Sequence, residues 1–179
     1  ITLALVPTNI PGIEIGRRHY PLNQTFQNGP NSGKDVFIPL DWVIGGKAHV
    51  GHGWHMLMEC LADGRSISLP ALSTGAGKLA SHAVGAYAHI RKQFNRPIGD
   101  FGGISEALTR IAGNTYIMDA ARNLTITSID SGEKPSVASA VVKYHMTEKM
   151  RQLVNDAMDV YGGAAICMGP RNIMGRIYQ

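Results

Sequence analysis

A cationic and aromatic stretch, residues 90–101 (I-R-K-Q-F-N-R-P-I-G-D-F), carries the residue types best suited to binding a ligand. Its three cations and two aromatic side chains are Arg91, Lys92, Arg96, Phe94 and Phe101. A guanidinium group pairs with a phosphate, and an aromatic face stacks on a flat ring. The stretch therefore suits a phosphate-containing, flat-ringed ligand. The alternative is a solvated helix end whose cations complement the negative end of the helix dipole.

Arg65 and the pair Gly162-Gly163 could each contact a ligand. Arg65 stands near the expected start of a long helix, where the dipole repels a cation by about 0.3–1 kcal/mol. That placement indicates an arginine that meets an anion or a carbonyl-bearing ligand, or one that is simply tolerated on the surface. Gly162-Gly163 would end a helix as a cap, or would let the backbone approach a ligand closely.

Histidines offer metal and proton-transfer chemistry, each with a simpler explanation. His52 and His55 stand three residues apart with Glu59 four further on, but the sequence has no H-E-x-x-H pattern. We therefore expect ordinary surface polarity and no metal site. The single histidines predicted on helices could each act as a general base, although amphipathic helices often carry histidines. These are His82, His89 and His145.

Serine nucleophiles and nucleotide-binding loops are not indicated. Ser66, Ser68 and Ser73 lie near glycines, but there is no G-x-S-x-G elbow. No G-x-G-x-x-G loop follows a predicted strand, and there is no Walker loop, so a Rossmann or P-loop site is disfavoured. Cys60 and Cys167 are not part of a C-x-x-C pair, which argues against metal binding and a disulfide framework and fits a reducing compartment.

Length and composition favour a globular chain with an anionic partner. The 179 residues are 44% hydrophobic and 17% charged, enough for one domain or one domain plus part of another. The net charge of +4 and the pI near 9.2 favour phosphorylated cofactors, nucleic acid or anionic lipid. Without a Lys/Arg run we do not expect nucleic acid binding. No apolar run reaches about 18 residues, so we expect no membrane span.

Short β segments are predicted in the first 51 residues. Apolar runs cover residues 2–6, 12–15, 36–38 and 42–44, and residues 23–34 have loop chemistry. Such short strands do not form a stable domain alone. Because the chain starts at Ile1 within a predicted strand, we expect it to be an internal piece of a longer protein.

A helical period follows from residue 54 onward. We expect a short helix over residues 54–61, a break at Asp63-Gly64, a long helix to about residue 94, a second over 103–126 and a third over 135–161. Their predicted buried stripes are Leu79, Ala83, Tyr87, Ile90 and Phe94; Ile104, Leu108, Ile111 and Met118; and Val137, Val141, Tyr144, Met150, Val154, Ala157 and Tyr161. Short joins indicate an antiparallel bundle, so the fold class is α+β, mainly α.

Four motifs in order resemble the acyl-CoA dehydrogenase family. They are G-H-G-W (51–54), L-A-D-G-R (61–65), R-K-Q-F-N-R-P-I (91–98) and Y-G-G (161–163), against the family's G-x-G-F, L-x-x-G-R, R-x-x-F-G-x-P-[IL] and Q-x-x-G-G. Residues 127–137 and 168–175 look similar to the bacterial long-chain fatty-acid-oxidation branch. The resemblance implies that residues 1–51 are the second part of a middle β domain and residues 52–179 an incomplete C-terminal helical bundle.

The resemblance also implies FAD as cofactor. Arg91 matches the arginine that contacts the FAD pyrophosphate of a neighbouring subunit, and Gln93 and Phe94 match residues at the adenine end. Phe101 belongs to the same corner. The segment matching Asp159 to Gly163, with Gly162, lines that FAD too, and Arg65 would lie beside the acyl-CoA entrance.

The implied activity is α,β-dehydrogenation of fatty acyl-CoA to the trans-2-enoyl-CoA in β-oxidation. Fatty acyl-CoA, an electron-transfer flavoprotein and further copies of the chain, in a homodimer or higher homo-oligomer, are the expected partners. We expect a cytoplasmic location, with attachment to the inner membrane surface left open.

Three departures from the family pattern limit the resemblance. A carboxylate, Asp159, replaces the family glutamine and would repel a pyrophosphate unless paired. Gly102 follows Phe101 where the family has glutamine. Gly64 occupies one family position of the catalytic glutamate and the other lies beyond Gln179, so we expect no catalytic residue here and an inactive isolated chain. The alternative is a helical interaction module that keeps the fold without flavin.

Overall fold

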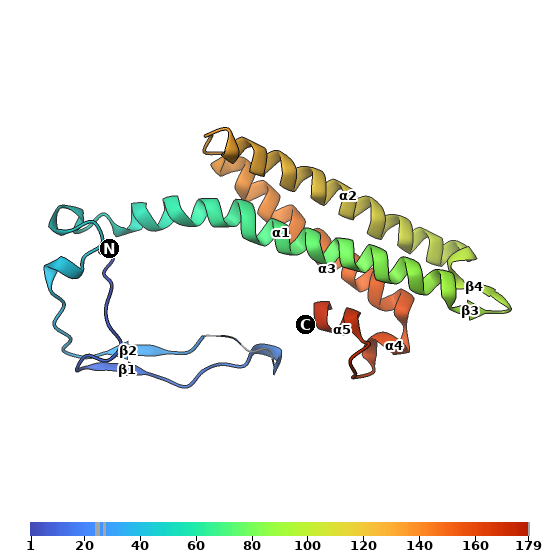
Figure 1. Cartoon of the computed structure of the whole chain (residues 1–179), viewed down its shortest axis with the longest axis horizontal. Coiled ribbons are helices and arrows are strands. Elements are labelled where there is room, and N and C mark those ends of the chain that lie inside the picture. The colour runs from blue at the N-terminus through green and yellow to red at the C-terminus, as the bar shows by residue number, and fades with distance from the viewer. Residues whose placement is uncertain (24–25, 27, 179) are drawn as a thin grey trace. The chain divides into compact units, whose positions relative to one another are not determined.

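A computed structural model describes residues 1–23, 26 and 28–178. The chain divides into two compact units, Ile1–Cys60 and Leu61–Gln179. The first unit consists mostly of extended and turn segments, whereas the second is built from helices (Figure 1). A mainly helical fold with few strands confirms the predicted fold class.

The first unit holds a short antiparallel sheet. Strand β1 (Ile13–Ile15) pairs with β2 (Asn31–Gly33), with Glu14 opposite Ser32. Short 3-10 helices also lie in this unit: η1 (Pro21–Asn23), η2 (Leu40–Trp42) and η3 (Lys47–His49). Among the hydrophobic residues described in this unit, only Val43 is buried.

The predicted strands of this unit are only partly correct. The segments around residues 2–6 and 42–44 meet in a single bridge between Ala4 and Val43, and residues 36–38 form no strand. Strand β2 lies inside the stretch predicted as loop, of which residues 24, 25 and 27 lie outside the described part. Strand pairing depends on long-range partners, which local residue preferences do not report.

Helix α1 (Gly53–Ile90) is continuous over 38 residues, so the predicted break at Asp63-Gly64 is wrong. One glycine lowers helix propensity by only about 1 kcal/mol, which neighbouring turns can offset. Pro70 also lies inside the helix, fully buried, and its carbonyl accepts a hydrogen bond from Thr74 Oγ1 at 2.8 Å. The helix ends at Ile90 and not near residue 94, because a hairpin follows.

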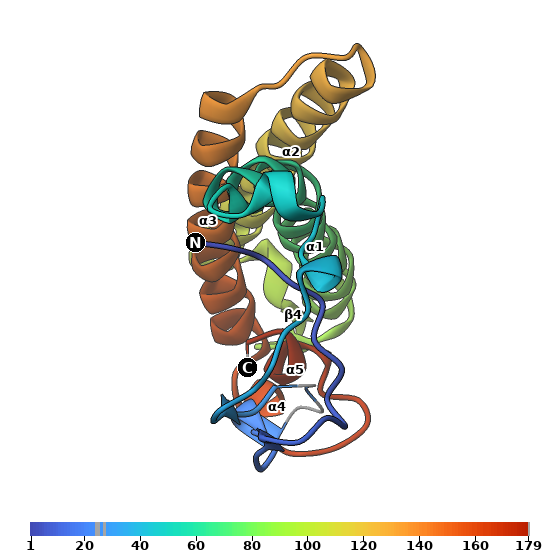
Figure 2. The same ribbon diagram turned by 90° about the vertical axis from the view of Figure 1, so that its left-hand side faces the viewer.

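That hairpin pairs β3 (Lys92–Gln93) with β4 (Arg96–Pro97) and leads through η4 (Ile98–Asp100) into α2 (Gly102–Asp130). Helix α2 runs four residues beyond its predicted end. Helix α3 (Ser136–Tyr161) ends at Tyr161 as predicted, and it begins one residue later than predicted because Pro135 is its N-cap. Short helices α4 (Gly163–Ile166) and α5 (Ile173–Tyr178) follow. Helices α1, α2 and α3 lie alongside one another (Figures 1 and 2), which confirms the bundle.

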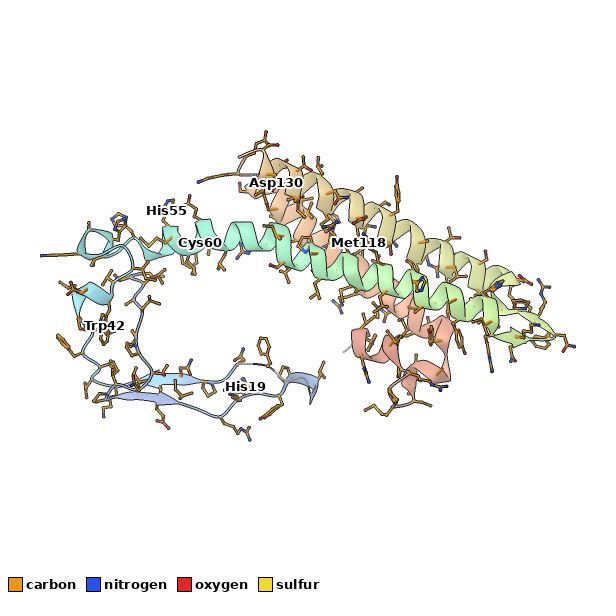
Figure 3. All side chains as sticks on the ribbon, viewed as in Figure 1. His19, Trp42, His55, Cys60, Met118 and Asp130 are labelled. Atoms are coloured by element: carbon orange, nitrogen blue, oxygen red, sulfur yellow. The ribbon has the colours of Figure 1, made fainter. Side chains whose placement is uncertain are left out.

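The bundle core combines small residues of α1 with larger residues of α2 and α3. Its fully buried members include Ala80, Val84, Ile111, Met118, Met146 and Leu153. Met118 is labelled in Figure 3. The stripe predicted on α2 is confirmed, with Ile111 and Met118 buried and Ile104 and Leu108 packed against them.

The stripes predicted on α1 and α3 are partly wrong. On α1, Ala83 and Tyr87 pack against the core, but Leu79 and Ile90 are exposed, because the buried row of alanines and Val84 lies one residue later. Phe94 is exposed in the hairpin that follows the helix. On α3, the second half is correct with Val154 and Ala157 buried. Its first three members, Val137, Val141 and Tyr144, are exposed.

Small side chains let α1 approach α2 closely. A Cβ atom added at Gly77 would lie 2.8 Å from Thr115 Oγ1 and 3.4 Å from Leu153 Cδ2. One turn later, the Ser81 hydroxyl lies 3.1 Å from the same Thr115 hydroxyl, which donates to the Ile111 carbonyl. Gly77 is therefore required by packing.

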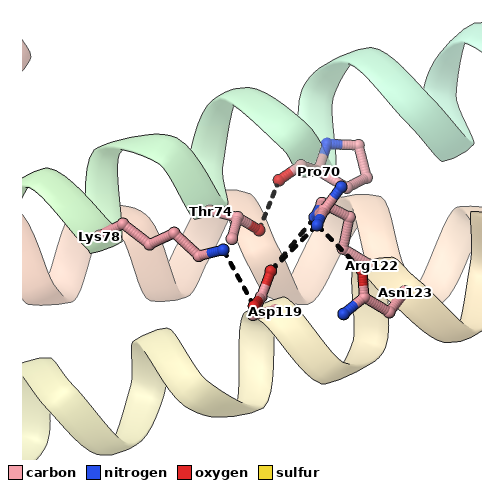
Figure 4. Close-up of polar contacts among 6 residues, drawn as sticks. All are labelled: Pro70, Thr74, Lys78, Asp119, Arg122 and Asn123. Carbon is pink, nitrogen blue, oxygen red and sulfur yellow. Dashed lines mark hydrogen bonds and ion pairs between the residues drawn. The ribbon is translucent and has the colours of Figure 1, made fainter.

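Ion pairs at the surface fasten the same helices (Figure 4). Lys78 Nζ of α1 lies 3.0 Å from Asp119 Oδ2, and Arg122 Nη2 lies 3.1 Å from Asp119 Oδ1. The hydrogen bond from Lys78, followed by that from Arg122, lowers the pKa of Asp119 below its ordinary value although partial burial acts against this. On the other side of α2, Arg110 binds Asp156 of α3 through two hydrogen bonds.

Replacing Gly77 by alanine tests the close approach. Gly75→Ala is the matched control, because its Cβ would meet no atom within 4 Å and gains the same helix propensity. We expect Gly77→Ala to be less stable than Gly75→Ala by about 1–3 kcal/mol, because the Thr115 region is overpacked. Urea denaturation measures both. Equal stabilities would contradict the packing described.

The acid dependence of stability tests the Asp119 ion pair. A carboxyl with a lowered folded pKa stabilises the fold above its unfolded pKa, near 3.8, and loses this contribution as the pH falls through the folded value. We expect wild type to exceed Asp119→Asn in stability at neutral pH. The difference should shrink below pH 3.8. Denaturation midpoints across this range measure it, and a difference independent of pH would contradict the ion pair.

Candidate functional site

The corner between α1 and α2 is a tight hairpin with strained turn residues. Its two turn positions, Phe94 (φ 51°) and Asn95 (φ 62°), have left-handed backbones, as a two-residue hairpin requires. That conformation is uncommon for a bulky residue such as phenylalanine. The Ile98 amide donates to the Arg91 carbonyl at 2.8 Å and closes the hairpin. Phe94 is 88% exposed, so the turn presents an aromatic ring to solvent.

Arg96 and Phe101 are held within the corner. The Arg96 guanidinium carbon lies 4.8 Å from the centroid of the Phe101 ring, and Arg96 Nη2 donates to the Asp100 carbonyl at 2.9 Å. Phe94 meets Phe101 edge to face, with centroids 6.2 Å apart. These contacts fix the direction of the hairpin, so Arg96 and Phe101 support the corner.

Arg91, by contrast, is a free cation. Its backbone amide donates to the Tyr87 carbonyl at 2.8 Å, which fixes the Cα at the end of α1. Its exposed guanidinium makes no hydrogen bond or ion pair with any residue that the structure describes. The nearby Gln93 side chain donates to the Lys92 carbonyl at 2.8 Å. Of the corner's two arginines, Arg91 is therefore the one available to an anion.

The end of α3 comes to the same end of the bundle. Tyr161 stacks on Tyr87 of α1 with centroids 4.3 Å apart and planes at 18°, and its hydroxyl donates to the Ala83 carbonyl at 3.2 Å. Burial, with a smaller effect of Tyr87, raises the pKa of Tyr161. Arg91 follows Tyr87 by one turn and Gly162 directly follows Tyr161, so this stack links the segments that carry Arg91 and the glycine pair.

The glycine pair is open to solvent. Gly162 (φ 58°) ends α3, its amide donating to the Met158 carbonyl at 2.9 Å, so its backbone explains the glycine. Gly163 has no such requirement, and a Cβ there would meet no atom within 4 Å. Asp159, one turn earlier, is exposed and makes no ion pair with a described residue. The glycines and an uncompensated carboxylate therefore lie together.

Arg65 lies far from this site. It is exposed on α1, roughly 39 Å along the helix from Arg91 at 1.5 Å per residue. The predicted residues therefore form a group at the hairpin corner, a second group at the end of α3 that the Tyr87–Tyr161 stack links to it, and one remote arginine. The sequence motifs did not show that Tyr87 joins the two parts of the group; its one-turn spacing from Arg91 was the available signal.

The other candidates remain scattered. His55 lies 3.8 Å from Glu59, both exposed, and no three His, Cys, Asp or Glu side chains among the described residues gather as a metal site. Ser73 is buried, whereas His82, His89 and His145 are exposed. In the described part of the chain, none of the helices combines the length and apolarity needed to traverse a bilayer.

Curated proteins match this chain over part of its length or over nearly all of it. The chain is 58% identical over 86 residues to Protein HemX of Proteus mirabilis, covering 48% of this chain and 51% of that protein. It is 28% identical over 165 residues to the probable acyl-CoA dehydrogenase FadE10 of Mycobacterium tuberculosis, covering 91% and 25%. It is 34% identical over 114 residues to the 3-(aryl)acrylate reductase of Clostridium sporogenes, covering 62% and 29%.

Solved structures share the fold. An acyl-CoA dehydrogenase from Geobacillus kaustophilus superposes with a TM-score of 0.87 at 19% identity, covering 99% of this chain and 45% of that one. PigA with FAD and proline gives 0.82 at 23%, again covering 99% and 45%. The chain thus spans about half, or less, of the length of these proteins.

The family model described as "Acyl-CoA dehydrogenase, C-terminal domain" matches residues 51–179, which is more than half of the chain. The matched region contains the corner, the end of α3 and the whole of the bundle helices. The chain therefore belongs to the acyl-CoA dehydrogenase family.

Proposed function

We propose that the hairpin corner and the end of α3 hold the diphosphate and adenine of an FAD bound by a neighbouring copy of the protein. The observation that carries this proposal is the unpaired, exposed Arg91 guanidinium beside an outward-facing Phe94 ring. A guanidinium matches phosphate oxygens geometrically, and an aromatic face suits a purine. The FAD complex of the structural neighbour PigA supports a flavin in this fold.

The residues at this end fit such a group with one exception. The open space at Gly163 lets a ligand approach the backbone, where a side chain would intrude. Gly162 and Gly163 would line the cofactor, with Gln93 near the adenine end. Asp159 does not fit, because an unpaired carboxylate repels a diphosphate. Arg91 therefore has to compensate two negative partners, which makes it the critical residue.

We propose that the whole protein dehydrogenates a fatty acyl-CoA at its α and β carbons, in the bacterial long-chain branch of the family. The flavin would supply the redox chemistry. The residues of this chain would position and polarise the cofactor and the substrate. Arg91 would hold the cofactor, and Arg65, remote on α1, would flank the acyl-CoA entrance. Gly64 cannot take a proton, and we propose that none of residues 1–179 is the catalytic base. The name of FadE10 supports an acyl-CoA substrate, whereas that of the 3-(aryl)acrylate reductase supports a wider class of substrates.

The remaining assignments are proposals of the same kind. We propose the domain division at residues 51 and 52, an electron-transfer flavoprotein as the electron acceptor, a homo-oligomeric enzyme and a cytoplasmic location. The second candidate function is an interaction module without flavin, and Asp159 is the observation that favours it. A measurement of flavin binding distinguishes the dehydrogenase from the interaction module.

Reversal of charge at Arg91 tests the site in the flavoprotein that contains this chain. We expect Arg91→Glu to raise the Kd of FAD about 10- to 100-fold, since a charged hydrogen-bonding group contributes about 1.5–3 kcal/mol. Lys92→Glu is the matched control, because it makes the same change of charge at the adjacent exposed residue. Titration of the apoprotein with FAD measures both. Equal effects, or none, would contradict a specific diphosphate contact.

Adding one methyl group at Gly163 tests the backbone approach. Because no atom of the chain lies within 4 Å of the new Cβ, Gly163→Ala should leave the fold as stable as before. We expect FAD affinity to fall about tenfold, equivalent to about 1.4 kcal/mol. The control is Gly85→Ala on α1, where the added Cβ also meets no atom within 4 Å. It should leave the FAD affinity unchanged and should change the stability only by the difference in helix propensity between glycine and alanine. Unchanged affinity in Gly163→Ala would remove the glycine pair from the site.

A further inference from the structure

Strands β1 and β2 of the first unit continue beyond their ends as a two-stranded ribbon. The Gly16 amide donates to the Pro30 carbonyl at 2.9 Å, and the His19 amide donates to the Asn28 carbonyl at 2.7 Å. Figure 1 shows this ribbon leading away from the two strands toward η1. We call its far end, residues 17–22 and 26, the ribbon tip.

Two glycines bring the arms of the ribbon close together. A Cβ atom added at Gly16 would lie 2.7 Å from Pro30 Cγ, and one added at Gly29 would lie 2.7 Å from the Arg17 carbonyl oxygen. Such distances leave no space for a side chain at either position. The close arms therefore hold the ribbon tip in a defined place beyond β1 and β2.

Positive charge gathers at the ribbon tip without acidic partners in the same segment. Residues 16–34 include Arg17, Arg18 and Lys34 but no aspartate or glutamate. All three cations are exposed, and neither arginine side chain makes a hydrogen bond or ion pair with any residue that the structure describes. A surface of uncompensated positive charge attracts an anionic partner.

Large apolar side chains occupy the same ribbon tip. Tyr20 is 68% exposed, Leu22 is 62% exposed and Phe26 is 53% exposed. Exposed apolar side chains that gather on one surface mark a place where a partner binds. Tyrosine in particular favours the boundary between water and lipid, where its ring is buried and its hydroxyl stays hydrated.

A hollow of about 300 Å³ lies beside the tip, on the arms of the ribbon. Arg18, Asn28 and Asn31 line it together with the backbone at Gly29. A guanidinium group and two side-chain amides can all donate hydrogen bonds to phosphate oxygens. The hollow therefore suits the phosphate of a lipid headgroup.

An anionic membrane accounts for the cations and the apolar side chains together. Interfacial segments bind bilayers through buried apolar side chains and through the attraction of Lys and Arg to anionic lipids. Nucleic acid binding needs cations along several phosphates, and the aliphatic Leu22 cannot stack on a base. A protein partner would need a separate pocket for each large side chain, whereas a fluid bilayer takes them without such a match.

We propose that the ribbon tip attaches the protein to the surface of an anionic membrane. Tyr20, Leu22 and Phe26 enter the headgroup region, while Arg17 and Arg18 contact lipid phosphates. The tip belongs to the first unit and the cofactor corner to the second. The attachment therefore does not rest on the binding of FAD.

Cosedimentation of the flavoprotein that contains this chain with lipid vesicles tests the attachment. We expect binding to vesicles of mixed phosphatidylcholine and phosphatidylglycerol and none to phosphatidylcholine alone. Arg18→Glu should weaken binding about 10- to 30-fold, because it replaces attraction to the anionic surface by repulsion. Lys47→Glu is the matched control, because it reverses an exposed charge of the same unit outside the ribbon, and it should have a much smaller effect.

Several results of that experiment would overturn the attachment. They are the absence of binding to the anionic vesicles, equal binding to both kinds of vesicle, and equal losses in Arg18→Glu and Lys47→Glu. Free CoA, added at constant ionic strength, should leave the protein on the vesicles. Its release would assign the arginines to a soluble phosphate ligand instead. Circular dichroism checks that each variant is folded.

Fluorescence quenching by lipids with brominated acyl chains tests the entry of the apolar side chains separately. We expect Phe26→Trp to add fluorescence that these vesicles quench. Phe37→Trp is the matched control, because Phe37 is 81% exposed but follows β2 at the end of that strand away from the tip. Its added fluorescence should not be quenched. Equal quenching in the two variants, or none in Phe26→Trp, would contradict insertion of the tip.

Discussion

The stacking of Tyr87 on Tyr161 is the interaction on which the candidate site depends. It joins the last turn of α1 to the last turn of α3, and the Tyr161 hydroxyl secures the pair to the Ala83 carbonyl. Four residues after Tyr87 the chain presents Arg91, and directly after Tyr161 it presents two glycines. Two segments some 70 residues apart in sequence therefore supply a cation and an accessible backbone to one place.

Small residues set the packing of α1, the helix that carries Tyr87. Gly77 and the small buried residues Ala80 and Ala88 keep α1 near its neighbours, and the hydroxyls of Ser81 and Thr115 meet across the crossing. Helices α2 and α3 were predictable from the sequence because their buried residues are large and periodic. The buried face of α1 was predicted one residue too early, because alanine gives a weak hydrophobic signal. The predicted break at Gly64 does not occur, because the helical turns on both sides offset the low helix propensity of one glycine.

The site was predictable as a list of residues and not as an arrangement. Arg91, Phe94 and Gly162-Gly163 follow from motif order, but their convergence depends on tertiary contacts that no local pattern encodes. The same limit applies to Arg96, whose stacking on Phe101 makes it a support of the hairpin, while Arg91, earlier in the same motif, stays free. The short β segments were the least predictable, because their pairing depends on distant partners.

The central claim is that Arg91 contacts the diphosphate of an FAD held by another copy. A structure of the FAD-loaded oligomer tests it most directly. We expect the Arg91 guanidinium to lie within hydrogen-bond distance, about 2.7–3.2 Å, of an oxygen of a diphosphate that is bound mainly by a neighbouring subunit. A diphosphate contacted by other cations, with Arg91 in solvent, would contradict it.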